Sequence, residues 1–190
     1  MKRLMTALTV LTLAGCAQVP TAVPAGNFTS ETDMNLKLAN SWSVWPSALN
    51  TSTRGEYLTK DGYLLNRLHV MSLKDNESIL KAAKDADVPR YKVGATESEI
   101  VALVTNSLNQ IGYSGVEADN IRFQTVDGAS GIRFDLTGKW ENGLDVRGDC
   151  LAVPGSETLD LVMFMAPELH YYAASAEEVD AAFNSVHLAR

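Results

Sequence analysis

Two stretches of the chain carry apolar residues at the spacing of a helix that covers a core. The first follows a capping box formed by Thr96 and Glu99, and it stops at Gly112. The second follows Ser175, which repeats the box together with Glu178. The pattern therefore predicts a helix after each box. The apolar stripes are Ile100, Leu103, Val104, Leu108 and Ile111 in the first helix, and Val179, Ala182, Phe183 and Val186 in the second.

Between these helices, residues 121–166 alternate apolar and polar positions and are interrupted by short turn sequences. The turns are Asp127-Gly128, Asn142-Gly143 and Pro154-Gly155-Ser156. This pattern predicts four strands in an antiparallel meander. The last strand, Leu159–Ala166, is apolar on both faces apart from Asp160, so we expect it in the centre of the sheet.

The N-terminal half has a strand pattern too. Met34–Leu38 predicts the first strand, and Glu56–Leu73 predicts a hairpin that turns at Asp61-Gly62. The returning arm, Tyr63–Leu73, carries apolar residues on both faces, so we expect it to be covered on both sides. Asn76–Lys84 predicts a short helix.

Charged residues on one face of the meander suggest how its strands pair. Arg133 and Asp135 share a face with Arg147 and Asp149. Setting Asp135 opposite Arg147 also sets Arg133 opposite Asp149, and each such pair contributes roughly 0.2–1 kcal/mol. We interpret these charges as a solvated or salt-bridged sheet face and not as an active site.

The composition is that of a folded, acidic protein. Of the 190 residues, 46% are hydrophobic and 7% are aromatic, as in globular domains. The formal net charge is −7, with 16 Lys or Arg residues against 23 Asp or Glu residues. Such a surface argues against nucleic acid as a partner.

The first 16 residues have the layout of a secretory signal. A basic start precedes an apolar run that ends at Leu13 and is shorter than the roughly 20 residues needed to span a bilayer. The sequence Leu13-Ala14-Gly15-Cys16 resembles the lipobox of bacterial lipoproteins. The resemblance implies cleavage before Cys16, lipidation of its thiol and acylation of the new N-terminus; the alternative is an ordinary signal peptide with a chance cysteine. Ala17, where inner-membrane lipoproteins of enterobacteria carry Asp, favours the outer membrane.

We therefore divide the chain into a signal peptide (residues 1–15), a lipidated N-terminus with a flexible tether (16–33) and a single domain (34–190). The tether has two prolines and few apolar anchors, although Phe28 leaves open a packed N-terminal arm. Removing residues 1–15, which hold two basic and no acidic residues, leaves 175 residues with a net charge of −9. That length is sufficient for one domain with a substantial core.

Several residue types that can carry chemistry are interpreted as structural. Once Cys16 is lipidated, Cys150 lies alone in a predicted strand, where burial is favoured over a nucleophilic role. Trp42 and Trp45 are interpreted as core residues more readily than as a ligand platform. His69 is interpreted as a hydrogen-bonded partner within the fold and not as a metal ligand.

The order of these elements resembles the PsbP/Mog-type fold, including small bacterial lipoproteins of the DcrB kind. The likeness covers roughly residues 34–188 and begins with the hairpin sequence Asp61-Gly62-Tyr63-Leu64-Leu65-Asn66. The capped middle helix and the meander follow. Ala166-Pro167, with aromatic residues after it, then leads to the closing helix. It implies an α+β domain, an α/β/α sandwich with a mainly antiparallel sheet and flanking helices. It also implies a scaffold for partner binding, with no catalytic residues to carry over.

The sequence contains none of the common metal-binding, nucleotide-binding or hydrolase motifs, so we assign no catalytic residue, metal or cofactor. Glu168 and His170 allow an acid–base pair, but Pro167 indicates a loop there. His170, Tyr171 and Tyr172 form the candidate partner surface, with packing beneath the last helix as the alternative.

Two classes of function follow. The preferred one is a lipid-anchored envelope protein that faces the periplasm, joins the membrane through its N-terminal lipid and binds a protein, cell-wall or membrane component without catalysis. The second is a small periplasmic hydrolase with a nonstandard His/acid site. A deep pocket with converging His and carboxylate groups would favour the hydrolase, whereas a shallow, mostly apolar patch would favour binding.

Overall fold

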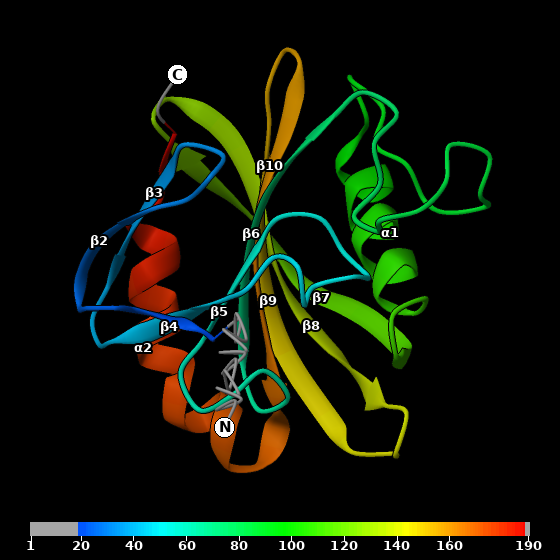
Figure 1. Cartoon of the computed structure of the whole chain (residues 1–190). Helices are drawn as coiled ribbons and strands as arrows, with labels where there is room; N and C mark the ends of the chain where they lie inside the picture. The colour runs from blue at the N-terminus through cyan, green and yellow to red at the C-terminus, as the bar shows by residue number, and fades with distance from the viewer. Residues whose placement is uncertain (1–18, 189–190) are drawn as a thin grey trace, which may run out of the picture.

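In the computed structural model, which describes residues 19–188, the chain folds into three layers (Figure 1). Within this range the central layer is an antiparallel sheet of eight strands in the order β1-β4-β5-β6-β10-β9-β8-β7. Helix α1 covers one face, and α2 covers the other together with a small sheet in the order β11-β3-β2. This arrangement confirms the predicted α+β sandwich with its mainly antiparallel sheet and flanking helices.

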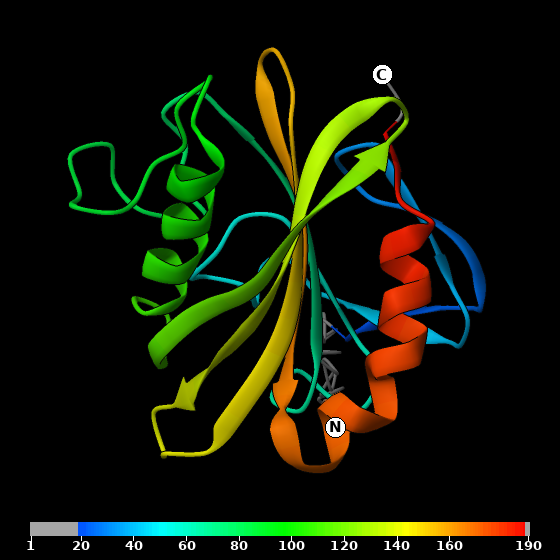
Figure 2. The same cartoon turned by 180° about the vertical axis from the view of Figure 1, so that it is seen from behind.

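The elements in chain order are β1 (Thr21–Val23), β2 (Gly26–Thr29), β3 (Met34–Leu38), β4 (Trp42–Trp45), β5 (Glu56–Thr59), β6 (Arg67–Lys74), α1 (Glu97–Leu108), β7 (Tyr113–Val126), β8 (Ala129–Trp140), β9 (Asp145–Pro154), β10 (Thr158–Pro167), the kinked turn η1 (Glu168–Tyr172), α2 (Ala173–Asn184) and β11 (His187–Leu188). Figure 2 shows the same layers from behind, with the sheet between α1 and α2.

The predicted meander is present, and its last strand is central as expected. β7, β8, β9 and β10 are neighbours in both sequence and space, and β6 pairs with the other edge of β10. Leu161 and Met163 of β10 belong to the core beneath α1, whereas Val162 and Phe164 belong to the core beneath α2. Both faces of β10 are apolar because each is covered by its own layer.

The predicted middle helix is confirmed, and the short helix before it is wrong. The Thr96 side chain accepts a hydrogen bond from the Glu99 backbone N–H, and the Glu99 carboxylate accepts one from the Thr96 N–H. Asn76–Lys84, in contrast, runs as an irregular segment in which Leu80 forms an isolated bridge with Thr53. Ile79 and Leu80 are buried all the same, because the segment lies against the core beneath α1, whereas Ala83 is exposed.

The closing helix is also present, but the capping box predicted at its start is wrong. The chain enters α2 directly from η1 with Tyr172 already in a helical conformation, so Ser175 lies inside the helix. Glu178 is buried there and accepts a hydrogen bond from Trp42 of β4. None of the helices within residues 19–188 is long and apolar enough to cross a membrane.

The flexible tether predicted over residues 16–33 is wrong for residues 21–29. β1 pairs with the edge of the large sheet at β4, and β2 pairs with β3. Phe28 is buried in the core beneath α2, as in the alternative of a packed arm. An open sheet edge offers unpaired backbone groups to such a segment, which explains its order despite the prolines. Cys16 and the rest of the lipobox lie outside the described residues.

The register predicted between β8 and β9 is wrong by two residues. Asp135 pairs with Asp149, and Arg147 lies opposite Thr137. The prediction considered only these two strands, whereas Arg122 of the neighbouring strand β7 supplies the missing positive charge. Arg133 still reaches Asp149 along the diagonal, at 3.2 Å.

Candidate functional site

A pocket of about 340 Å³ opens at the end of the sheet where β6 begins and β10 ends. Three connections surround it, namely the β5–β6 loop, the β8–β9 turn and η1, which lie at the lower end of the molecule in Figure 1. Its lining is mostly apolar and consists of Leu64, Leu65, Arg67, Tyr113, Trp140, Asn142, Leu144, Val146, Met165, Ala166, Pro167, Leu169 and Tyr171. This volume is at the small end of the range of ligand pockets, about 300–1,000 Å³.

Arg67 is the charged residue of this pocket, and it is buried. The residue is only 8% exposed, although a guanidinium keeps its charge at any physiological pH. One terminal nitrogen donates a hydrogen bond to the Tyr113 hydroxyl at 2.7 Å. None of the ion pairs among residues 19–188 includes Arg67. Within the described part of the chain, the positive charge therefore lies inside the protein without a carboxylate partner.

Aromatic rings take the place of that partner. The guanidinium carbon lies 4.5 Å from the centre of the Trp140 ring and 4.9 Å from that of Tyr63, with Tyr113 and Tyr57 at 5.5 Å and 5.9 Å. A cation over an aromatic face is stabilised by about 0.5–2 kcal/mol. These contacts offset part of the cost of burying the charge, but a ring accepts no strong hydrogen bond from the guanidinium.

The loop before β6 brings part of this lining into place. Predicted as strand from Tyr63 onward, it is instead a compact turn built around the buried side chain of Asn66. Its amide oxygen accepts hydrogen bonds from the backbone N–H groups of Lys60 and Asp61, and its amide nitrogen donates to the Asp61 carboxylate. A side chain that satisfies the loop backbone in this way replaces the strand ladder. The loop therefore presents Leu64 and Leu65 at the pocket and Tyr63 at the hollow beside it.

The mouth of the pocket is surrounded by leucines that face solvent. Leu64 is 69% exposed, Leu144 is 41% exposed and Leu169 is 80% exposed, and each comes from a different connection. An adjoining apolar hollow extends this surface to Trp45, whose ring stacks on Tyr63 at 5.0 Å. We call Leu64, Leu144 and Leu169 the leucine rim. Contiguous exposed apolar surface of this kind marks an interaction site more often than scattered apolar residues do.

The predicted partner surface is divided by the structure. Tyr171 lines the pocket, and the exposed His170 ring lies edge-on to it at 5.0 Å. Tyr172 turns to the sheet instead, where its hydroxyl donates a hydrogen bond to Asp149 at 3.0 Å. The Glu168 carboxylate forms an ion pair with Arg147, at 3.7 Å. The acid–base pair suggested for Glu168 and His170 therefore has no support, because the carboxylate is engaged by Arg147.

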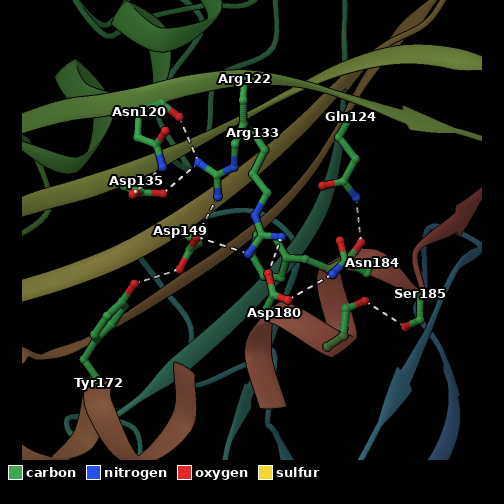
Figure 3. Close-up of polar contacts among 12 residues, drawn as sticks. Asn120, Arg122, Gln124, Arg133, Asp135, Asp149, Tyr172, Asp180, Asn184 and Ser185 are labelled. Carbon is green, nitrogen blue, oxygen red and sulfur yellow. Dashed lines mark hydrogen bonds and ion pairs between the residues drawn. The ribbon is translucent and has the colours of Figure 1, made fainter. Parts of the chain in front are cut away.

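A network of ion pairs on the α2 side holds Tyr172 in place (Figure 3). Asp149 forms an ion pair with Arg133 at 3.2 Å and accepts a hydrogen bond from the Tyr172 hydroxyl. Arg133 also forms an ion pair with Asp180 of α2, at 2.8 Å. Burial and the charge of Asp149 raise the pKa of Tyr172 to about 12. The network joins α2 and η1 to the meander, which agrees with the predicted salt-bridged sheet face.

The remaining candidates of the sequence analysis are structural. Cys150 is fully buried, and burial raises the pKa of its thiol far above the usual range, so it is a core residue as predicted. His69 is buried, stacks on Tyr57 at 3.9 Å and donates from Nε2 to the Arg54 carbonyl oxygen. Trp42 is buried in the core, as predicted, whereas Trp45 is half-buried beside the pocket.

Arg67 is a site residue that the sequence pattern did not predict, although one signal was present. Arg67 lies inside the run Tyr63–Leu73, which is apolar on both faces. A charged residue on a strand covered on both sides has to be paired, exposed at a strand end or functional. The aromatic residues around it could not be foreseen, because Tyr113 and Trp140 belong to distant strands that meet only in the folded sheet.

Comparisons with known proteins identify the fold. No protein-family profile matches the chain, and no curated protein matches it significantly. Among solved structures, the cyanobacterial PsbP protein CyanoP from Synechocystis sp. PCC 6803 is similar, with a TM-score of 0.60, 10% sequence identity, and coverage of 94% of this chain and 98% of that chain. The chain therefore has a PsbP-like fold.

Two further solved structures overlap less well. Protein PA94 of unknown function from Pseudomonas aeruginosa has a TM-score of 0.39 at 9% identity, with 75% of this chain and 94% of that chain covered. LpqN, a protein involved in cell envelope biogenesis of Mycobacterium tuberculosis, has a TM-score of 0.38 at 12% identity, with 92% of this chain and 86% of that chain covered.

Proposed function

We propose that this chain is a lipid-anchored accessory protein of the bacterial envelope that binds an apolar partner and catalyses no reaction. It faces the periplasm from the outer membrane, to which the acyl groups on Cys16 attach it. The lipobox resemblance of Leu13-Ala14-Gly15-Cys16 supports the anchor, and Ala17 supports the outer membrane. The PsbP/Mog resemblance and the PsbP-like fold support a binding scaffold, although fold alone does not define a function.

The observation that carries the binding role is the chemistry of the pocket. Among the residues that the structure describes, its lining includes no Ser, His, Cys, Asp or Glu, the residue types that most often act as nucleophile, acid or base in hydrolysis. Its mouth instead presents Leu64, Leu144 and Leu169 to solvent. An exposed apolar rim around a small pocket favours binding over hydrolysis, because apolar surface contributes to affinity when a partner removes it from water.

Metabolic labelling tests the anchor. We expect the wild-type chain to incorporate labelled palmitate and to fractionate with membranes. We expect Cys16→Ser to take up no label and to leave the membrane fraction, because the thiol is the attachment point. A Cys16→Ser chain that still fractionates with membranes while carrying no label would contradict anchoring by lipid.

Binding of the neutral dye Nile red tests the apolar pocket. The change is the double substitution Leu64→Asp and Leu169→Asp, which places charges on the rim without disturbing a buried side chain. We expect it to weaken dye binding at least about tenfold, because a charge resists transfer to an apolar contact. Phe123→Asp is the matched control, since Phe123 is 75% exposed on β7 and does not line the pocket. Equal loss in both variants, or none in either, would contradict the proposal.

Affinity capture from intact envelopes extends the test to the natural partner. Wild type, Cys16→Ser, the rim variant and Phe123→Asp should be compared side by side. We expect the partner to be lost with the rim substitutions while Phe123→Asp retains it.

A further inference from the structure

The unpaired charge of Arg67 is the feature of the pocket that the binding role alone leaves unexplained. A guanidinium has five N–H donors, and among the described residues only the Tyr113 hydroxyl accepts from it. The remaining N–H groups are not among the side-chain atoms that the described residues bury fully without a partner, so they face the pocket, where an acceptor can reach them. The surrounding rings contact the faces of the guanidinium but cannot satisfy its N–H groups. An anion from outside the chain would satisfy them.

The position of Arg67 indicates how such an anion enters. Arg67 lines both the pocket and a much smaller adjoining cavity whose other lining residues are almost all buried, so it lies at the inner end. Met165 of β10 pairs with Arg67 of β6 in the sheet and therefore lies beside it. The Met165 sulfur occupies space that Gly148 leaves free by having no side chain. The leucine rim lies at the other end, where the pocket meets solvent. The pocket is therefore polar and cationic at its inner end and apolar along its walls and at its mouth.

We propose that the pocket binds a carboxylate that carries a single hydrocarbon chain, with the carboxylate on Arg67 and the chain extending past the leucine rim. The inference rests on the proposed apolar binding role and adds the head group. A carboxylate matches the planar fork of the guanidinium, which it can engage through two parallel hydrogen bonds. The small volume fits one chain in preference to two. A tail that leaves through the mouth keeps the exposed leucines in contact with hydrocarbon.

Calorimetric titration of three ligands tests the head and the tail separately. The protein is the full chain carrying Cys16→Ser, so that no acyl group of its own competes. The ligands are dodecanoate, dodecanol and butanoate, with dodecanoate below the concentration at which it forms micelles and dodecanol below its solubility limit. We expect dodecanoate to bind at least about tenfold more tightly than dodecanol, because only the carboxylate forms charged hydrogen bonds with Arg67. We expect butanoate to bind at least about a hundredfold more weakly than dodecanoate, because it lacks eight methylene groups.

Substitutions at Arg67 identify the residue responsible. We expect Arg67→Met to bind dodecanoate and dodecanol equally and Arg67→Lys to retain a preference for dodecanoate, since lysine keeps the charge. Phe123→Asp should leave all three affinities unchanged. Where Arg67→Met does not fold, the comparison of dodecanoate with dodecanol on the otherwise unmodified site decides the question.

The results separate this inference from the proposed function. Equal binding of dodecanoate and dodecanol would overturn the carboxylate assignment, while rim-dependent binding of Nile red would leave the apolar binding role standing. Binding of an apolar peptide through its free C-terminus, without binding of dodecanoate, would also overturn the hydrocarbon ligand. A preference for dodecanoate that disappears in Arg67→Met supports both.

Discussion

Asp135 and Asp149 lie directly opposite each other on neighbouring strands, β8 and β9. Two carboxylates in this position would repel each other. Arg122 of β7 lies 2.8 Å from an oxygen of Asp135 and 3.5 Å from one of Asp149, so one guanidinium bridges the two carboxylates, and Arg133 adds a second cation at 3.2 Å from Asp149. The charges on this face of the sheet are therefore balanced across three strands, β7, β8 and β9, and not by ion pairs between two neighbouring strands alone.

We expect Arg122→Met to lower the free energy of unfolding by about 1–2 kcal/mol, because Asp135 loses its cation and faces Asp149, which keeps only Arg133. Adding Asp135→Asn should restore most of that loss by removing one of the charges. Urea denaturation of the four proteins of this double-mutant cycle measures the effect. Lys139→Met is the control, since its ion pair with Asp145 is more than half exposed and should contribute under about 0.5 kcal/mol. An Asp135→Asn effect that is equal in both backgrounds would argue against a shared counter-ion.

The fold could be predicted from sequence where the signals are local. The capping box of Thr96 and the glycine-containing turns of the meander involve residues close together in the chain, and both predictions are confirmed. The register failed because the counter-charge, Arg122, lies on a third strand. The strands β1 and β2 were not predicted, because they pair with open edges at β4 and β3. No pattern within residues 17–33 reveals those edges.

The candidate site was less predictable than the fold. Tyr171 was expected at a binding surface and lines the pocket, but Tyr172, its neighbour, is used by the fold. The pocket itself depends on Arg67 meeting Tyr113 and Trp140, which come from three strands. Sequence spacing shows none of these contacts, because each requires the twist and pairing of the whole sheet.

We expect Glu178 of α2 to contribute strongly to the free energy of unfolding. Its carboxylate accepts hydrogen bonds from Trp42 Nε1 at 2.8 Å, the Asn40 backbone N–H at 3.1 Å and Lys60 Nζ at 2.9 Å. Burial acts to raise the pKa of Glu178, but these three donors together hold it below its ordinary value. We expect Glu178→Ala to lower the free energy of unfolding by about 1–3 kcal/mol, since it leaves buried donors without an acceptor.

Urea denaturation followed by tryptophan fluorescence checks the Glu178 prediction. Because the folded pKa is lowered, the stabilisation is present above the unfolded value of 4.5 and is lost as the pH falls through the folded value. The difference between wild type and Glu178→Ala should therefore shrink in acid. Glu177→Ala, an exposed neighbour, is the control. A constant difference at every pH would show that packing, and not the ionised carboxylate, is responsible.

His69 should make the protein less stable as the pH falls below neutral. Burial lowers its pKa from 6.5 to about 3, and the nearby charges of Arg67 and Lys81 act in the same direction. Between these two values the unfolded chain binds a proton that the folded chain does not. The free energy of unfolding therefore falls by up to about 1.4 kcal/mol for each unit of decreasing pH.

His69→Gln isolates this effect, because the glutamine amide can still donate to the Arg54 carbonyl but does not titrate. Urea midpoints of both proteins between pH 4.5 and 7.5, a range set by the unfolded value near 6.5, supply the measurement. We expect the wild-type curve to descend more steeply in acid than the variant curve. Parallel curves would mean that His69 is protonated in the folded protein.

Substitutions at the neighbouring residues Tyr171 and Tyr172 should affect different properties, dye binding at the first and stability at the second. Tyr172→Phe removes the hydrogen bond to Asp149 and should cost about 1 kcal/mol in the free energy of unfolding while leaving Nile red affinity unchanged. Tyr171→Phe should change neither quantity, because the pocket is lined by the ring. Tyr171→Ala should weaken dye binding several-fold, because it removes apolar wall from the pocket. If Tyr171→Ala instead lowers stability and leaves dye binding intact, the side chain serves the packing beneath α2, and the binding surface is confined to the leucine rim.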